Sequence, residues 1–312
     1  MLGHSHGHDS DHGHAHGPGA FSNTRTFALV TLLNLAFTAI EAFYGFWTNS
    51  LALLTDALHN LGDVLGLGLA WAAAVLAKRP PNARHTYGWR RATLLSPLAN
   101  AVLLVVFSGA LGWEAIRRFN APPEIPALPV IVVAAIGIGV NLLGAWMVRG
   151  GHDTDLNRRG AYLHLMADAA VSLAAVLAGL GMWFLGWSWL DPATALLISV
   201  VIAVGAWALL RDSFEAAMDA VPRSIDRDAV LVFLSTRPGV SAVHHLHIWA
   251  LGAGEIAMTA HLVRSPGDDH DAFIDALVHD LDHEFGINHP TLQVEHGNLC
   301  EHDLHDRAPH AH

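Results

Sequence analysis

The stretch LALLTDALHNLGDVLGLGLAWAAAVLA, residues 51–77, decides the fold, because it is long and apolar enough to cross a membrane yet carries ionisable side chains. Asp56, His59 and Asp63 follow an i, i+3, i+7 spacing, so they form a polar stripe on one face of a helix. An ionisable group at the centre of a bilayer costs roughly 2.5 to 3.5 kcal/mol on insertion scales. The stripe therefore indicates a functional site, in which Asp56 is either a member or a carboxylate that orients an imidazole.

A second apolar stretch, residues 160–187, repeats the same pair of side chains with His164 and Asp168. A four-residue step returns to the same helical face, so each stretch aims one imidazole and one carboxylate at a common point. Together with His59 and Asp63, these residues supply the four ligands of a tetrahedral zinc site. The alternative is that the two pairs are hydrogen bonds that only hold helices together.

The composition predicts an α-helical membrane protein. Hydrophobic residues make up 52% of the chain and charged residues 14%, whereas roughly 25% of an ordinary soluble domain is charged. A helix needs about 20 apolar residues to cross the hydrocarbon. The candidate spans form a membrane domain at residues 25–211 and cover residues 26–48, 51–77, 92–117, 127–148, 160–187 and 190–210.

The distribution of basic residues predicts the orientation of the spans. If the N-terminus lies inside, the outer connections hold only Arg117 and Arg118, and the inner segments hold the other Lys and Arg residues near the spans. The positive-inside rule then places both termini in the cytoplasm. Asp191 followed by Pro192 predicts an N-cap and a first helical position for the last span.

Both ends of the chain are rich in histidine. Residues 1–24 form a predicted disordered tail, whose spaced histidines are typical of loose binding of Zn, Ni or Cu. Residues 298–312 are also rich in histidine and contain Cys300. Because Cys300 is the only cysteine in the sequence, an internal disulfide is excluded. The net charge of -11 argues against a nucleic-acid partner.

Residues 212–297 predict a soluble, ferredoxin-like α+β domain of two helices and three strands. The predicted order is helix 226–235, strand 240–250, strand 255–264, helix 269–285 and strand 291–296. Histidines and one carboxylate gather on these strands at His244, His245, His247, His261, His289 and Glu295. Their clustering favours a metal site over a set of isolated surface histidines.

Six motifs in this order resemble the cation diffusion facilitator family, in particular its bacterial zinc and cadmium exporters and zinc-transporting relatives. The resemblance extends over residues 24–296. The motifs are SLALLTDALHNLGD (50–63), RHTYGWRR (84–91), GAYLHLMAD (160–168), VHHLHIWAL (243–251), AHLV (260–263) and TLQVE (291–295).

This resemblance implies a homodimeric antiporter in the bacterial inner membrane that exchanges cytoplasmic Zn²⁺ for protons by alternating access. It places the transport site on the two His-Asp pairs, a ligand set expected to favour Zn²⁺ over Cd²⁺. It also implies a cytoplasmic zinc site formed by His244, His261, His289 and Glu295. His247 and Cys300 are candidate accessory ligands. The resemblance does not extend to a further loop site of some members, because Trp89 stands where a second histidine would accompany His85.

The remaining polar residues near the spans allow more than one role. Glu41 and Asn34 on the first span are interpreted either as a proton route or as helix-helix hydrogen bonds. The resemblance suggests that Arg91 and Asp212 interlock the membrane and soluble parts. The alternative functions are a membrane metal sensor and a histidine-box metalloenzyme, although the latter needs histidines clustered at the span ends. The chain is not expected to be an enzyme.

Overall fold

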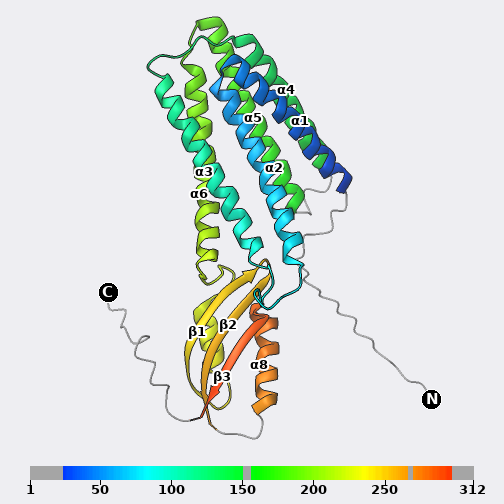
Figure 1. Ribbon diagram of the computed structural model, residues 1–312, viewed down its shortest axis with the longest axis vertical. Coiled ribbons are helices and arrows are strands. Elements are labelled where there is room, and N and C mark those ends of the chain that lie inside the picture. Colours follow the sequence, from blue (N-terminus) through cyan, green and yellow to red (C-terminus); the bar gives the residue numbers. More distant parts are fainter. Residues whose placement is uncertain (1–23, 150–155, 266–269, 297–312) are drawn as a thin grey trace, which may run out of the picture.

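The computed structural model describes residues 24–149, 156–265 and 270–296. In this part of the chain, six long helices are followed by a small domain of strands and shorter helices (Figure 1). Each long helix contains a segment that is long and apolar enough to cross a membrane, as predicted. The helices are α1 (Thr24–Thr48), α2 (Leu51–Ala77), α3 (Ala92–Arg118), α4 (Ala127–Val148), α5 (Leu156–Leu185) and α6 (Leu190–Ala217).

The helices pack most closely as the pairs α4 with α5 and α3 with α6; α1 packs on α4, and α2 lies between α1 and the α3–α6 pair (Figure 1). Small residues allow this approach. A Cβ atom added at Gly137 of α4 would lie 2.7 Å from the Phe37 ring of α1 and 3.0 Å from the Ser172 hydroxyl of α5. Glycine at this position therefore lets three helices meet beside the predicted site.

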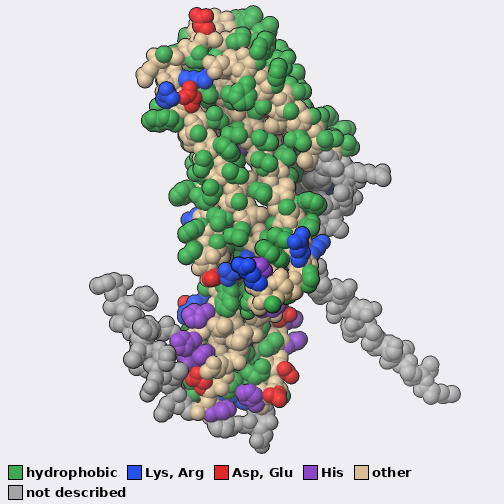
Figure 2. Space-filling view, in the orientation of Figure 1, with side chains coloured by type: hydrophobic (Ala, Val, Ile, Leu, Met, Phe, Trp, Pro, Cys, Tyr) green, Lys and Arg blue, Asp and Glu red, His purple; other side chains and the backbone are tan. Residues whose placement is uncertain are grey.

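The outer surface of the helices is strongly apolar, whereas histidine side chains in view gather on the small domain and basic side chains gather mainly where the two parts meet (Figure 2). Large side chains such as Phe46, Trp71 and Val204 are at least two-thirds exposed. Such a surface suits lipid and would be costly in water. The distribution agrees with the predicted division into a membrane domain and a soluble domain.

The N-terminal end of α2 is capped from two directions. Ser50 accepts a hydrogen bond from the backbone N–H of Leu53 and donates one to the Asp191 carboxylate. Asp191 also accepts from the backbone N–H groups of Leu51 and Ala52. Asp191 therefore caps α2, not its own helix as the sequence suggested, because α6 already begins at Leu190 and carries Asp191 in its first turn.

The sixth helix also runs past its predicted end at residue 210. Arg211 and Glu215 are one helical turn apart, and their Nε and Oε1 atoms lie 3.7 Å apart. Ion pairs at this spacing stabilise an exposed helix slightly. The helix therefore continues beyond its apolar segment and ends at Ala217.

The small domain contains α7 (Arg227–Ser235), β1 (Val240–Gly252), β2 (Glu255–Arg264), α8 (His270–Phe285) and β3 (His289–Glu295). The sheet has the order β1-β2-β3, with β1 antiparallel and β3 parallel to β2. Its buried core includes Leu234 of α7, Leu246 of β1, Met258 of β2 and Leu281 of α8. One face of the sheet is thereby covered by the helices, and the other carries the histidines.

This arrangement agrees with the predicted α+β domain and departs from the full ferredoxin-like order in one respect. That order is βαββαβ, in which a first strand separates the two parallel strands. In the described residues that strand is missing, and β2 pairs directly with β3.

Candidate metal sites

The two His-Asp pairs meet between α2 and α5. The His59 Nε2 atom lies 3.6 Å from Asp168 Oδ1, and the His164 Nε2 atom lies 3.2 Å from Asp63 Oδ2. Each imidazole therefore faces the carboxylate of the other helix. Within α5, the His164 and Asp168 side chains are 3.5 Å apart. The structure brings together all four residues that the four-residue spacing selected.

This membrane quartet, defined as His59, Asp63, His164 and Asp168, is open on one side and closed on the other. Asp168 is only 1% exposed, whereas His164 is 45% exposed. The centres of the two imidazole rings lie 6.0 Å apart. The quartet offers two imidazole nitrogens and two carboxylates to one cation, which is a suitable ligand set for zinc.

Two further carboxylates are buried beside the quartet. Asp56 is 1% exposed and accepts a hydrogen bond from the Ser172 hydroxyl of α5. Glu41 is fully buried and accepts from the Asn60 side-chain amide of α2. Among the described residues, each carboxylate keeps one oxygen without a hydrogen-bond partner. Asn34, the other candidate for a proton route, is half-buried two helical turns from Glu41.

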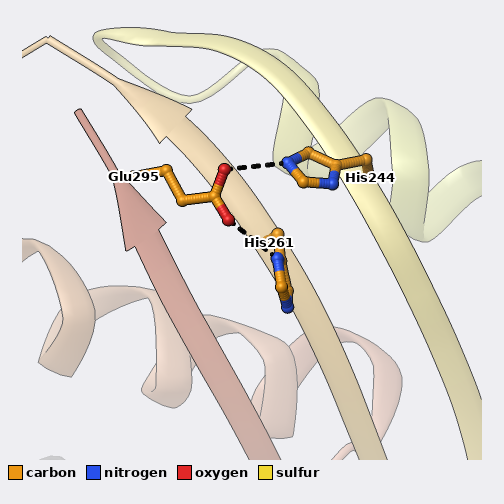
Figure 3. A group of neighbouring side chains, drawn as sticks. All are labelled: His244, His261 and Glu295. Atoms are coloured by element: carbon orange, nitrogen blue, oxygen red, sulfur yellow. Dashed lines mark hydrogen bonds and ion pairs between the residues drawn. The ribbon is translucent and has the colours of Figure 1, made fainter. Parts of the chain in front are cut away.

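A second group of ligands lies on the face of the sheet that the helices leave uncovered. His244 of β1, His261 of β2 and Glu295 of β3 offer ligand atoms that all lie within 4.8 Å of one another (Figure 3). His261 Nδ1 is 2.9 Å from Glu295 Oε1, and His244 Nε2 is 3.2 Å from Glu295 Oε2. The register of the strands explains the group. His244 pairs directly with His261 on β2, and Glu295 pairs with Val263, which lies two residues from His261 and so on the same face of β2.

The surroundings of Glu295 favour its charged form. Its side chain is 14% exposed, and burial alone would oppose ionisation. Hydrogen bonds with His261 and His244 outweigh this burial and lower the pKa of Glu295 below its ordinary value. The carboxylate is therefore already in the form that binds a metal ion.

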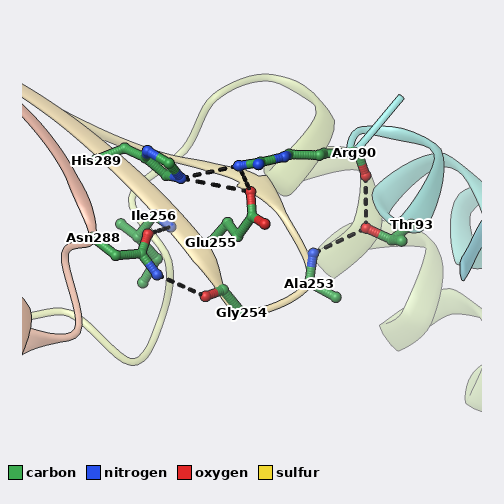
Figure 4. Close-up of polar contacts among 8 residues, drawn as sticks. All are labelled: Arg90, Thr93, Ala253, Gly254, Glu255, Ile256, Asn288 and His289. Carbon is green, nitrogen blue, oxygen red and sulfur yellow. Dashed lines mark hydrogen bonds and ion pairs between the residues drawn. The ribbon is translucent and has the colours of Figure 1, made fainter. Parts of the chain in front are cut away.

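His289 lies elsewhere, which corrects the four-residue set expected for the cytoplasmic site. It begins β3, whereas Glu295 ends the strand. At about 3.3 Å per residue, the two residues stand roughly 20 Å apart. The His289 ring instead contacts Arg90 at 3.0 Å and Glu255 at 3.7 Å (Figure 4).

These contacts join the soluble domain to the loop between α2 and α3. Arg90 forms an ion pair with Glu255 at the start of β2. The Thr93 hydroxyl accepts a hydrogen bond of 2.9 Å from the backbone N–H of Ala253 in the β1–β2 turn (Figure 4). The turn therefore rests directly on the N-terminal end of α3.

The expected interlock forms with a different acidic residue. Arg91 pairs with Asp219 at 2.8 Å, and Asp212 pairs with Arg223 at 2.6 Å. The reason is the length of α6, which places Asp212 inside the helix and Asp219 just beyond its end.

The accessory candidates are dispersed. His85 stacks on Trp89 in the α2–α3 loop, with ring centres 4.1 Å apart. His247 is exposed on β1, and Cys300 lies outside the described residues. A residue that the implied ligand set left out, His245, has its ring beside those of His244 and His261. The histidine-rich sequence of β1 was the available signal for it.

The fold defines a multi-pass membrane protein with paired imidazoles and carboxylates between its helices, and comparison with known proteins identifies the family. Residues 27–216 match the cation efflux transmembrane domain, and residues 222–297 match the cytoplasmic domain of cation efflux proteins. The chain belongs to the cation diffusion facilitator family.

Three relatives resemble the chain over most of their length. The zinc transporter ZitB of Escherichia coli (strain K12) is 36% identical over 289 residues, which cover 89% of this chain and 91% of that protein. A cadmium, cobalt and zinc/H(+)-K(+) antiporter of Bacillus subtilis (strain 168) is 33% identical, covering 93% and 97%. The metal cation efflux system protein CzcD of Cupriavidus metallidurans is 34% identical, covering 94% and 90%.

Proposed function

We propose that the protein is a zinc/proton antiporter that exports cytoplasmic Zn²⁺ across the bacterial inner membrane. The observation that carries this proposal is the crosswise pairing of two imidazoles and two carboxylates between α2 and α5. Borderline-soft imidazole suits Zn²⁺ better than the harder divalent ions. One relative is named as a zinc transporter and another as an antiporter of cadmium, cobalt and zinc, which supports the same class of substrate.

Protonation of the quartet provides the exchange. Zinc binds to deprotonated ligands, so protons that arrive at the site displace the metal, and arriving metal displaces protons. His59 and His164 supply imidazoles, which can bind either a proton or a metal ion. We infer that α2 and α5 present the quartet to the cytoplasm with zinc bound, release the metal outside and return with protons.

We further propose that Glu41 and Asp56 pass protons to the quartet. Both carboxylates are buried, and each has an oxygen without a hydrogen-bond partner in the part of the chain that the structure describes. A proton shared between them would supply the missing donor and remove one buried charge. The alternative role, helix-helix hydrogen bonding, is supported by the contacts of Glu41 with Asn60 and of Asp56 with Ser172.

The cytoplasmic group is proposed to bind a regulatory Zn²⁺ ion. His244, His261 and Glu295 fit this role, because zinc accepts both imidazole and carboxylate ligands. The contacts of Arg90 with Glu255 and of Thr93 with Ala253 connect the sheet to α3. Metal on the sheet can shift the transporter between states only if it binds one state more tightly. We propose that the functional unit is a homodimer with both termini in the cytoplasm.

The test uses purified protein in sealed vesicles that contain a zinc dye and a pH dye. An imposed proton gradient is expected to drive zinc movement, with protons moving in the opposite direction. The Asp168→Asn variant provides the inactive control. Zinc flux without proton movement would contradict antiport. Folded protein without any zinc flux would leave a metal sensor or a metalloenzyme as the better interpretation.

A further inference from the structure

A β-bulge in β1 places two consecutive histidines on the same face of the sheet. His244 pairs with His261, whereas His247 pairs with Thr259, so three residue steps on β1 match two on β2. The extra residue interrupts the usual alternation of side chains. Val243 and Leu246 both pack in the core, and the two residues between them therefore share the opposite face. That face carries the cytoplasmic metal group.

The three imidazole rings on this face form a nearly equilateral triangle. The ring centres are 5.1 Å apart for His244 and His245, 5.0 Å for His244 and His261, and 5.0 Å for His245 and His261. An imidazole bound to zinc at about 2.0 to 2.1 Å has its ring centre about 3.2 Å from the ion, so two rings on a tetrahedral ion lie about 5 Å apart. The triangle thus matches three imidazoles around one ion.

The backbone of His245 supports a functional role for its position. Its φ angle is +51°, in the left-handed region that non-glycine residues seldom adopt. Bulges commonly re-aim a side chain near a functional site. Here the unusual conformation turns the His245 side chain away from the core and towards His261.

We propose that His245 is a third imidazole ligand of the cytoplasmic zinc site. The ligand atoms of His244, His261 and Glu295 already converge, and the His245 imidazole would complete a four-ligand site within one chain, so that neither His289 nor a residue of another copy is required. This inference rests on the proposed regulatory site and adds a ligand that determines its affinity and geometry. Three imidazoles and one carboxylate give the coordination number that structural zinc sites prefer.

The test compares His245→Asn with His247→Asn in the full-length protein. His247 is a suitable control because it is exposed on the same strand, with its ring 6.4 Å from that of His245. Both variants carry Asp63→Ala and lack residues 2–17, which removes binding by the quartet and the histidine-rich tail. X-ray absorption at the zinc edge counts imidazole ligands, and competition with a chelator measures affinity.

We expect three imidazole ligands in the parent and in His247→Asn, and two in His245→Asn. The affinity for zinc should fall about tenfold or more only in His245→Asn, because one ligand is lost. Asparagine tolerates the left-handed region, so this variant is expected to fold. Equal imidazole counts and equal affinities in the two variants would overturn the proposal.

A glycine variant separates a metal ligand from a purely structural residue. His245→Gly relieves the backbone conformation, so the metal-free protein should become more stable to heat while zinc affinity falls. Lower stability without loss of zinc affinity would show that His245 has only a structural role. His244→Asn tests the underlying site. If neither His244→Asn nor His245→Asn lowers the affinity for zinc, the proposed regulatory site is refuted. If only His244→Asn lowers it, the regulatory site stands and only the role of His245 as a third imidazole ligand is refuted.

Discussion

The membrane quartet and the strand cluster, defined as His244, His245, His261 and Glu295, use the same kinds of side chain but differ in compactness. In the membrane the two imidazole ring centres are 6.0 Å apart, whereas the rings on the strands are 5.0 to 5.1 Å apart. The shortest imidazole–carboxylate distances are 3.2 Å and 2.9 Å, respectively.

This difference fits the proposed roles. The quartet joins two helices through side chains alone, so a small movement of α2 relative to α5 changes its geometry. The strand cluster lies on hydrogen-bonded strands of fixed register. A carrier must release its metal, which a loosely arranged site permits. A regulatory site should instead change its metal occupancy over a narrow range of zinc concentration.

The largest expected effect follows from removing one carboxylate of the quartet. Asp63→Ala should reduce zinc flux in vesicles by about 100-fold or more. Only three ligands remain, and the site loses one of the negative charges that compensate a bound cation. Asp212→Ala, which removes a carboxylate at the cytoplasmic end of α6, is the matched control. Flux near the wild-type level in Asp63→Ala, with the protein folded, would show that transport does not use the quartet.

A second substitution in the quartet tests whether its ligands set the selectivity between Cd²⁺ and Zn²⁺. His59→Asp converts the quartet to one imidazole and three carboxylates. We expect the ratio of Cd²⁺ to Zn²⁺ transport to rise several-fold, about fivefold, because zinc loses a favoured nitrogen ligand. Parallel flux measurements with the two ions test this. An unchanged ratio would locate selectivity outside the quartet.

The positions that could be predicted from the sequence are those that depend on local spacing. A helix returns to the same face after four residues, so the His-Asp pairs could be recognised without knowing which helices meet. Sheet sites depend on register, and one inserted residue changes the face of every side chain beyond it. The bulge at His245 has no such sequence signature. The bulge explains why His245 was left out of the implied ligand set, whereas His289 entered that set through the family resemblance and lies at the opposite end of β3 from Glu295.

The contacts between the domains also could not be predicted from local spacing in the sequence. Arg91 lies at the N-terminal end of α3, but its partner depended on where α6 ends. That helix continues to Ala217, so Asp219 rather than Asp212 reaches Arg91. Asp191 likewise caps α2, because the packing of two helix ends decides which N–H groups a buried carboxylate meets.

A variant of the strand cluster should change regulation more than transport. His261→Ala removes a ligand of the cytoplasmic site and leaves the quartet intact. Flux at low zinc is expected to fall about fivefold, within the usual range of coupling between sites, and to recover at saturating zinc. His279→Ala on α8, whose side chain is 78% exposed, is the control. Loss of flux at every zinc concentration would contradict a regulatory role.

The smallest expected effect concerns Glu295 in the metal-free protein. Because hydrogen bonds with His261 and His244 outweigh burial and lower the pKa of Glu295, its carboxylate stabilises the fold above the ordinary glutamate pKa of about 4.3. That contribution is lost as the pH falls through the lowered value. Glu295→Gln should therefore make β3 exchange its backbone hydrogens faster near neutral pH, with little difference from wild type in strong acid.

Hydrogen–deuterium exchange across a pH series tests this, with exposed Glu284→Gln on α8 as the control. Rates are compared at each pH with those of an unstructured peptide, which removes the intrinsic dependence of exchange on pH. A pH-independent difference between Glu295→Gln and wild type would show that Glu295 acts through packing alone. In that case its charge would matter only when metal is bound, and the metal-free strand cluster would depend on the sheet for its order.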